Sequence, residues 1–184
     1  MRSVLLTVLS LFISLSLFGC SSSTSNSGSG TDVKDVNEHS NKDSAPGMEG
    51  YVVDQQDGEI LVVDSVPKNY SASGGKPEFY NAIWFSYGQK NVAVGQKVQV
   101  WFNLVKQSYP GQSTAEKLRV VPAPKPDQAN IDEAEAIRQA LAEPAEDNPA
   151  VPVIKAVKYD EASDKWMVSI KRGDEVTDIQ IDDK

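Results

Sequence analysis

The sequence predicts a mainly β protein, α+β overall, with a small antiparallel barrel or open sheet followed by one helix and a three-stranded meander. Three observations lead to this fold class. Residues 50–121 contain short runs in which β-branched and aromatic residues alternate with polar ones. A proline-rich segment at 122–126 then forms a stiff connector. Beyond it, apolar residues recur at helical spacing, and three further strand-like runs complete the chain.

The chain begins with the layout of a secretory signal peptide. Arg2 supplies a positive charge, and an apolar run follows at residues 4–18. This run is too short for a membrane-spanning helix, which needs roughly 20 mostly apolar residues. It ends in Leu-Phe-Gly-Cys at residues 17–20, which resembles the lipobox of bacterial lipoprotein precursors. The resemblance implies removal of residues 1–19 by cleavage between Gly19 and Cys20.

The same resemblance implies that Cys20 carries a diacylglyceryl lipid and a further acyl chain of the palmitate type. Two or more acyl chains hold a protein stably on a bilayer. We therefore expect a lipoprotein anchored at the extracytoplasmic face of the bacterial cell membrane. The alternative is an incidental thiol in an ordinary signal peptide, but Leu17 would fit poorly at the −3 position of that cleavage site.

The charge of the chain limits its partners. The formal net charge is −8, and loss of Arg2 with the leader makes it −9. Anionic lipid and nucleic-acid phosphates repel such a body. We expect no nucleic-acid partner and a membrane attachment that depends on the lipid, without help from a basic patch.

Residues 20–48 are predicted to be the lipidated cysteine and a disordered tether, because Ser, Asn, Gly and Asp dominate them. His39, the only histidine, lies in this tether and is expected to be solvated spacer. With Cys20 lipidated, a histidine-dependent triad, a cysteine nucleophile and a His/Cys zinc site are all excluded. We therefore expect no catalytic residue, metal or cofactor. Paired carboxylates stay open among 26 acidic residues.

Residues 49–122 are predicted to form the β domain. Asp57-Gly58 lies between two β-rich runs and predicts a hairpin turn, because glycine accepts positive φ without strain. Residues 65–81 are expected to be a long loop. The five expected strands are 51–54, 59–63, 82–87, 98–102 and 117–121.

The two middle strands are predicted to pair with each other. One antiparallel register places every apolar residue of one strand opposite an apolar residue of the other. It also places Trp84 opposite Trp101 on the polar face, where the two indoles would form a candidate binding face. The alternative is that they pack on each other, under the 65–81 loop or under the C-terminal part. The apolar residues are Ile83, Phe85, Tyr87, Val98, Val100 and Phe102.

This β domain resembles the YobA-like lipoproteins of Gram-positive bacteria, which have a domain of unknown function. The resemblance covers residues 49–122 and implies an OB-like barrel. It brings no established activity and no functional residues. The matching segments are Gly-Tyr-Val-Val at 50–53, Ala-Ile-Trp-Phe-Ser at 82–86, residues 94–102 and Ser-Tyr-Pro at 108–110.

The last third, after a linker at 123–129, is predicted to be a small α+β unit over residues 130–184. Asn130 is the expected helix cap, and Pro144 ends the helix. Arg172-Gly173-Asp174 is expected to be a hairpin turn. A unit of about 55 residues buries little core, so it should dock on the barrel or on a partner. The expected strands are 153–159, 166–170 and 176–181.

The α+β unit is similar to the PepSY modules of secreted bacterial proteins, which implies a chaperone-like or inhibitory binding role. The sequence as a whole predicts a lipid-anchored, non-catalytic binding or accessory module. Its partner would be an unknown protein or a cell-wall ligand. The alternative is a small carboxylate-dependent hydrolase acting on cell-wall or peptide material.

Overall fold

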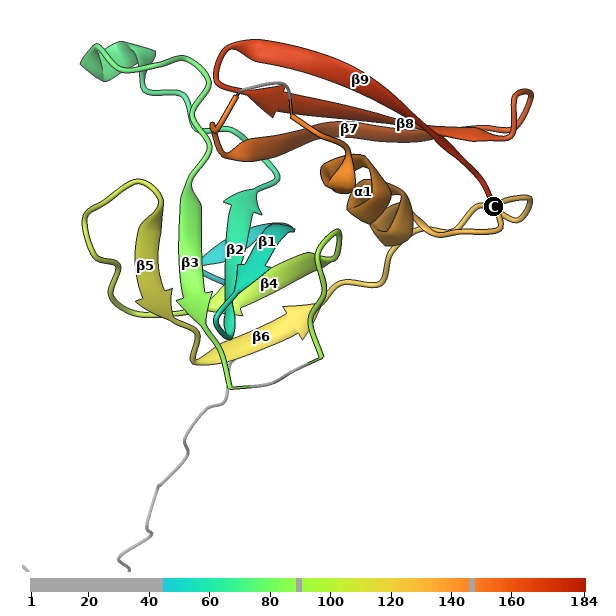
Figure 1. Cartoon of the computed structure of the whole chain (residues 1–184). Helices are drawn as coiled ribbons and strands as arrows, with labels where there is room; N and C mark the ends of the chain where they lie inside the picture. Colours follow the sequence, from blue (N-terminus) through green and yellow to red (C-terminus); the bar gives the residue numbers. More distant parts are fainter. Residues whose placement is uncertain (1–44, 89–90, 146–147) are drawn as a thin grey trace, which may run out of the picture. The chain divides into compact units, whose positions relative to one another are not determined.

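The computed structural model describes residues 45–88, 91–145 and 148–184 (Figure 1). The predicted signal peptide, Gly19, Cys20 and His39 lie outside these residues. The described chain contains a six-stranded sheet, one α-helix and a three-stranded antiparallel sheet. This confirms the predicted mainly β class and the order of its parts.

The six-stranded sheet is built around the hairpin of β1 and β2. Asp57 and Gly58 form its turn with φ angles of 50° and 81°, as the Asp-Gly pair predicted. On their other sides β1 pairs with β4 and β2 with β3, which gives the order β5-β3-β2-β1-β4-β6. The strands are β1 (Met48–Gln56), β2 (Glu59–Asp64), β3 (Ala82–Ser86), β4 (Lys97–Trp101), β5 (Gly111–Thr114) and β6 (Lys117–Val120).

The predicted pairing of the two middle strands is wrong. β3 lies beside β2, with Trp84 opposite Leu61, whereas β4 lies between β1 and β6. The predicted apolar residues of both strands nevertheless line one core. The rings of Phe85 and Phe102 contact each other there, with centroids 5.0 Å apart. The two apolar faces therefore meet across the core of a curled sheet, and not side by side in its ladder.

The sheet does not close into the expected antiparallel barrel. Its outer strands in the described chain, β5 and β6, are not paired with each other. The strand β5 was not predicted, because its Gly-Gln-Ser-Thr sequence has no apolar alternation; it pairs parallel to β3. The result is an open, mixed sheet. The buried residues of its core are Met48, Val52, Ile60, Val62, Ile83, Phe85, Val92, Val98 and Val100.

The helix α1 (Glu133–Ala142) follows the proline-rich linker. Its N-cap is Asp132, whose carboxylate accepts the N–H of Glu135 at 2.9 Å. The predicted cap, Asn130, is two residues too early. The helix ends before Pro144, as expected. No helix in the described ranges is long and apolar enough to cross a membrane.

The C-terminal sheet is a meander of β7 (Pro152–Asp160), β8 (Lys165–Arg172) and β9 (Glu175–Asp182), in that order. All three expected strands are present, each somewhat longer than predicted. Gly173 has a φ of 63° in the turn between β8 and β9. The Arg-Gly-Asp tripeptide is thus part of a hairpin turn, as the sequence analysis expected.

The helix and the meander pack against the outer face of β1–β3 in a second apolar core. Figure 1 shows α1 beside the meander, on the side that faces the first sheet. The small α+β unit therefore finds its docking surface within its own chain. Buried members of this core are Val53, Leu61, Val63 and Ala82 from the first sheet, Ala136, Ile137 and Ala140 from α1, and Val153, Ile154, Trp166, Val168 and Ile170 from the meander.

Asp183 fastens the C-terminus to the segment that precedes α1. It is only 3% exposed. Its carboxylate accepts the backbone N–H groups of Asn130 and Ile131, and the indole N–H of Trp166 at 3.2 Å. Burial acts to raise the pKa of Asp183, but these hydrogen bonds outweigh it and hold the pKa below its ordinary value. The carboxylate therefore stays ionised and tied to three donors.

Gly95 allows the loop before β4 to approach α1 closely. Its φ is +94°, and its N–H donates to the Val52 carbonyl at 2.8 Å. A Cβ at this position would lie 2.1 Å from the carbonyl oxygen of Ala134. Both the backbone conformation and the contact with the helix therefore require glycine.

We expect Gly95→Ala to destabilise the protein by about 1–3 kcal/mol or more, because the new Cβ strains φ and pushes on the first turn of α1. Urea unfolding followed by circular dichroism measures the change. Gly88→Ala is the matched control, since a Cβ there meets nothing within 4 Å. Equal stability of the two variants would show that the loop does not hold the helix.

Candidate functional site

The two tryptophans proposed as a binding face are not a pair in the structure. Trp84 lies between Leu61 of β2 and Gln112 of β5 in the ladder, and it packs half-buried against the second core. This is the alternative in which the indole lies under the C-terminal part. Trp101 is opposite Lys117 of β6, whose ammonium lies 4.6 Å from the centroid of its ring. Contact of either indole with a ligand stays a prediction.

The structure instead points to a pocket of about 650 Å³ between the first sheet's loops and the meander. This volume is typical of sites for small ligands. One wall comes from the long loop before β3 and from the loop before β5, and the other from the segment around the start of β7 and the β8–β9 turn. The lining residues are Lys76, Glu78, Phe79, Tyr80, Tyr109, Pro110, Pro149, Ala150, Val151, Val153, Lys171, Gly173 and Asp174.

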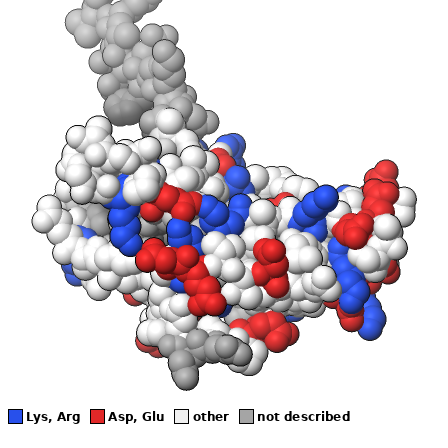
Figure 2. Space-filling view, turned by 90° about the horizontal axis from the view of Figure 1, so that it is seen from above, with Lys and Arg blue, Asp and Glu red and all other residues white. Residues whose placement is uncertain are grey.

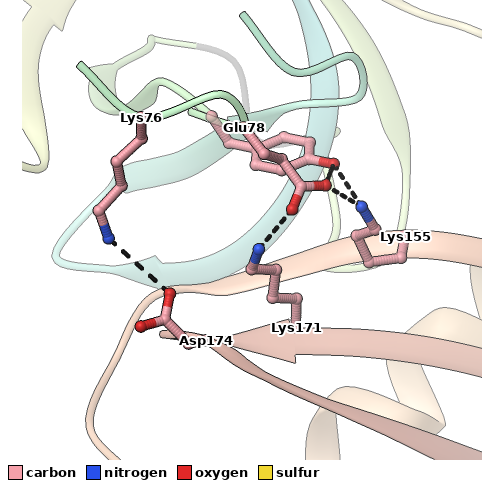
Figure 3. Close-up of polar contacts among 6 residues, drawn as sticks. Lys76, Glu78, Lys155, Lys171 and Asp174 are labelled. Atoms are coloured by element: carbon pink, nitrogen blue, oxygen red, sulfur yellow. Dashed lines mark hydrogen bonds and ion pairs between the residues drawn. The ribbon is translucent and has the colours of Figure 1, made fainter. Parts of the chain in front are cut away.

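Glu78 is the central charged group of this pocket (Figure 3). Its two carboxylate oxygens bind the ammonium groups of Lys155 on β7 and Lys171 on β8. The Tyr80 hydroxyl donates to the same carboxylate at 2.8 Å and accepts from Lys155 at 2.9 Å. This network joins the loop before β3 to two strands of the meander.

The network fixes the protonation state of Glu78. The hydrogen bond from Lys155, followed by those from Lys171 and Tyr80, lowers the pKa of Glu78 from 4.5 to about 2. In turn, the hydrogen bond to Glu78 raises the pKa of Lys155 above its ordinary value. Glu78 is thus a permanent anion near neutral pH, and it cannot serve as a general acid there.

A second ion pair lies at the rim of the pocket. Lys76 and Asp174 are 3.8 Å apart, and their side chains are 72% and 95% exposed (Figure 3). Such an exposed pair contributes only about 0–1 kcal/mol, so a ligand could displace it at little cost. Figure 2 shows acidic and basic side chains intermixed on the upper face of the molecule.

The remaining wall is aromatic and apolar. Phe79 contacts Tyr70 on one side and Tyr109 on the other, with centroid distances of 5.7 and 5.9 Å. Tyr109 is 56% exposed, and partial burial raises the pKa of its hydroxyl. The pocket therefore combines an accessible aromatic wall, a displaceable rim pair and a fixed internal ion network. This arrangement suits binding.

Sequence reasoning missed this site because its charged groups are distant in the chain. Glu78 precedes Lys155 by 77 positions and Lys171 by 93. Only Ser108-Tyr109-Pro110 gave a signal, as one of the segments that carried the family resemblance. In the described ranges no three His, Cys, Asp or Glu side chains gather where they could hold a metal ion.

Residues 49–122 match the model of a family described as a protein of unknown function, DUF3221. The match spans the six-stranded sheet and the loops that supply Glu78 and Tyr109, and it excludes Lys155 and Lys171. It covers less than half of the chain. No curated protein and no solved structure matches the chain.

We expect Glu78→Gln to lower the melting temperature near pH 7 and to lose this effect in acid. The pKa of Glu78 is about 2 in the folded state, below the ordinary 4.5. Its stabilising contribution is therefore complete above about pH 5 and is lost as the pH falls through about 2. Melting curves of both proteins from about pH 7 to 2 measure it, with Glu59→Gln as control. A difference that persists at the lowest pH would contradict the role of the ionised carboxylate.

Proposed function

We propose that this protein is an extracytoplasmic lipoprotein, held at the outer face of the bacterial cell membrane by a diacylglyceryl lipid on Cys20, and that it acts there as a non-catalytic binding module. The support for the anchor is the sequence alone: the apolar run 4–18 and the Leu-Phe-Gly-Cys segment that ends it. The mature chain, at −9, has little general attraction to anionic lipid.

The pocket beside Glu78 is the observation that supports the binding role. It offers a ligand the aromatic side chains of Phe79 and Tyr109. The exposed ion pair of Lys76 and Asp174 at its rim can be broken at little cost in free energy. Aromatic and apolar walls with a few charged groups are typical of binding sites. The ligand class we propose is a protein segment or cell-wall material, in keeping with the location.

The chemistry of the pocket argues against the alternative, a carboxylate-dependent hydrolase. Such an enzyme needs one carboxyl group held protonated beside a second one. The pocket's two acids are Glu78, whose pKa is about 2, and Asp174, which is 95% exposed. The low pKa of Glu78 keeps this carboxylate ionised near neutral pH, and the exposed position of Asp174 does not isolate a second carboxyl group from water.

We also propose the closer likenesses drawn from the sequence: the YobA-like lipoproteins for residues 49–122 and the PepSY modules for residues 130–184. The PepSY likeness would make the meander a participant in binding. Its contribution of Val153, Lys171 and Asp174 to the pocket supports this proposal.

We expect the protein extracted from membranes to begin at Cys20 and to carry the added mass of a diacylglyceryl group and an acyl chain. Intact-mass spectrometry measures both. The Cys20→Ser variant should no longer be found in the membrane fraction, because no acyl chain can attach to residue 20. A native protein that retains Met1, or that carries no acyl mass, would refute the anchor and the location inferred from it.

We expect Tyr109→Ala to weaken capture of the ligand by about tenfold or more, because it removes the exposed part of the aromatic wall. Binding is measured by pull-down from detergent-solubilised membranes and from cell-wall fragments. Leu104→Ala is the matched control, since Leu104 is 86% exposed and does not line this pocket. Equal losses of binding in both variants would refute the pocket as the binding site. Hydrolysis of wall or peptide substrates by the protein would refute the non-catalytic role.

A further inference from the structure

The strand β9 is an open edge of the meander. Its eight residues pair with β8 without interruption, from Arg172 opposite Glu175 to Lys165 opposite Asp182. On its other side no strand of the described chain pairs with it. Most residues of β9 are exposed, and the apolar Val176 among them is 53% exposed. Figure 1 shows it as the outermost strand of this sheet.

The hairpin geometry fixes which backbone groups of β9 point outward. Gly173 and Asp174 form a two-residue turn, so the pair that closes it is a hydrogen-bonded pair. Antiparallel pairs then alternate between bonded and non-bonded positions. The outward N–H and C=O groups are those of Val176, Asp178, Gln180 and Asp182. The Asp182 carbonyl accepts the N–H of Lys184, but in the residues that the structure describes no loop backbone group bonds to the other three residues.

The other sheet edges of the described chain are protected in the ways that proteins commonly protect edges. β7 begins with Pro152, carries a register shift between Ile154 and Ala156, and packs on the first sheet. β5 is covered by the bridge from Lys106 to Gln112. β6 is only four residues long and carries two cationic side chains. β9 contains no proline, bulge or lysine, and among the described residues no strand or bridge pairs with its outer side.

A hollow of about 590 Å³ lies along the β9 edge. Its lining includes Thr177 and Ile179, which face the core side of the sheet, and Asp178 and Gln180, which face the other side. A hollow that meets both faces of one strand runs along the edge of that strand. The charged residues of the lining are Glu143, Glu175 and Asp178 against Arg172.

We propose that β9 binds an extended, basic segment of a partner polypeptide, which adds to the meander as a fourth, edge-paired strand. Main-chain hydrogen bonds to the outward groups provide the affinity, as in other strand-addition complexes. The carboxylates of the hollow, with Glu175 on one face of β9 and Asp178 on the other, favour Lys and Arg side chains in the added segment. A second copy of β9 is disfavoured, because it would bring the same carboxylates, on two bodies of equal negative charge, against each other. The acidic edge thus discriminates against self-association.

The test uses the full-length chain in detergent and a blocked peptide of about ten residues that alternates Lys with Val, with a Glu-Val peptide as its counterpart. We expect the basic peptide to bind at least about tenfold more tightly than the acidic one and to protect the β9 amides from hydrogen exchange. Gln180→Pro removes one outward N–H and should weaken binding by about tenfold or more.

A charge variant keeps the test valid if the proline destabilises the strand. The double variant Glu175→Lys and Asp178→Lys should also lose about tenfold or more in affinity. Its control, Asp127→Lys with Glu161→Lys, makes the same change of charge at exposed acids that do not line the hollow and should stay within about twofold of the native chain. Equal binding of both peptides, equal losses in both double variants, or a dimer that Gln180→Pro dissociates would overturn the proposal.

Discussion

The apolar outer face of β1–β3 must be covered, and the rest of the structure depends on how α1 and the meander cover it. Leu61 and Val63 would be exposed on an isolated first sheet, yet they are 4% and 1% exposed here. Each such side chain contributes about 1.5–3 kcal/mol when it is buried. The meander gains in the same way, because a unit of this size cannot bury Trp166 and Val168 by itself. The two parts therefore stabilise each other.

The candidate pocket is a consequence of this docking. Once β7 and β8 lie against the first sheet, Lys155 and Lys171 come within reach of the loop that carries Glu78. The ion network bridges the polar margin of the interface, and the space beyond it forms the pocket. Asp183 acts at another margin, where it ties the segment before α1 to Trp166. Polar groups thus fix the geometry at the borders of an apolar contact.

Both proposed binding surfaces involve the meander, but they use different physics. In these proposals the pocket binds side chains or rings through Phe79 and Tyr109, whereas the β9 edge binds a backbone through its outward amide and carbonyl groups. Acidic side chains also differ in role between the two surfaces. Glu78 is neutralised within the fold by two lysines, while Glu175 and Asp178 remain at the open edge for a partner. An acidic chain can in this way select a basic partner and resist self-association.

The sequence by itself determined which residues of β3 and β4 face the first core, where the Asp57-Gly58 and Arg172-Gly173-Asp174 turns lie, and that the helix ends before Pro144. These are local properties, because alternation, Asp-Gly turns and proline act over a few residues. Only the tertiary structure decided that β3 lies beside β2, that Trp84 and Trp101 are separated, and that Glu78 meets two lysines of the meander. Matching apolar faces can meet as neighbours in a ladder or across a core, and the pattern of one strand is the same in both cases.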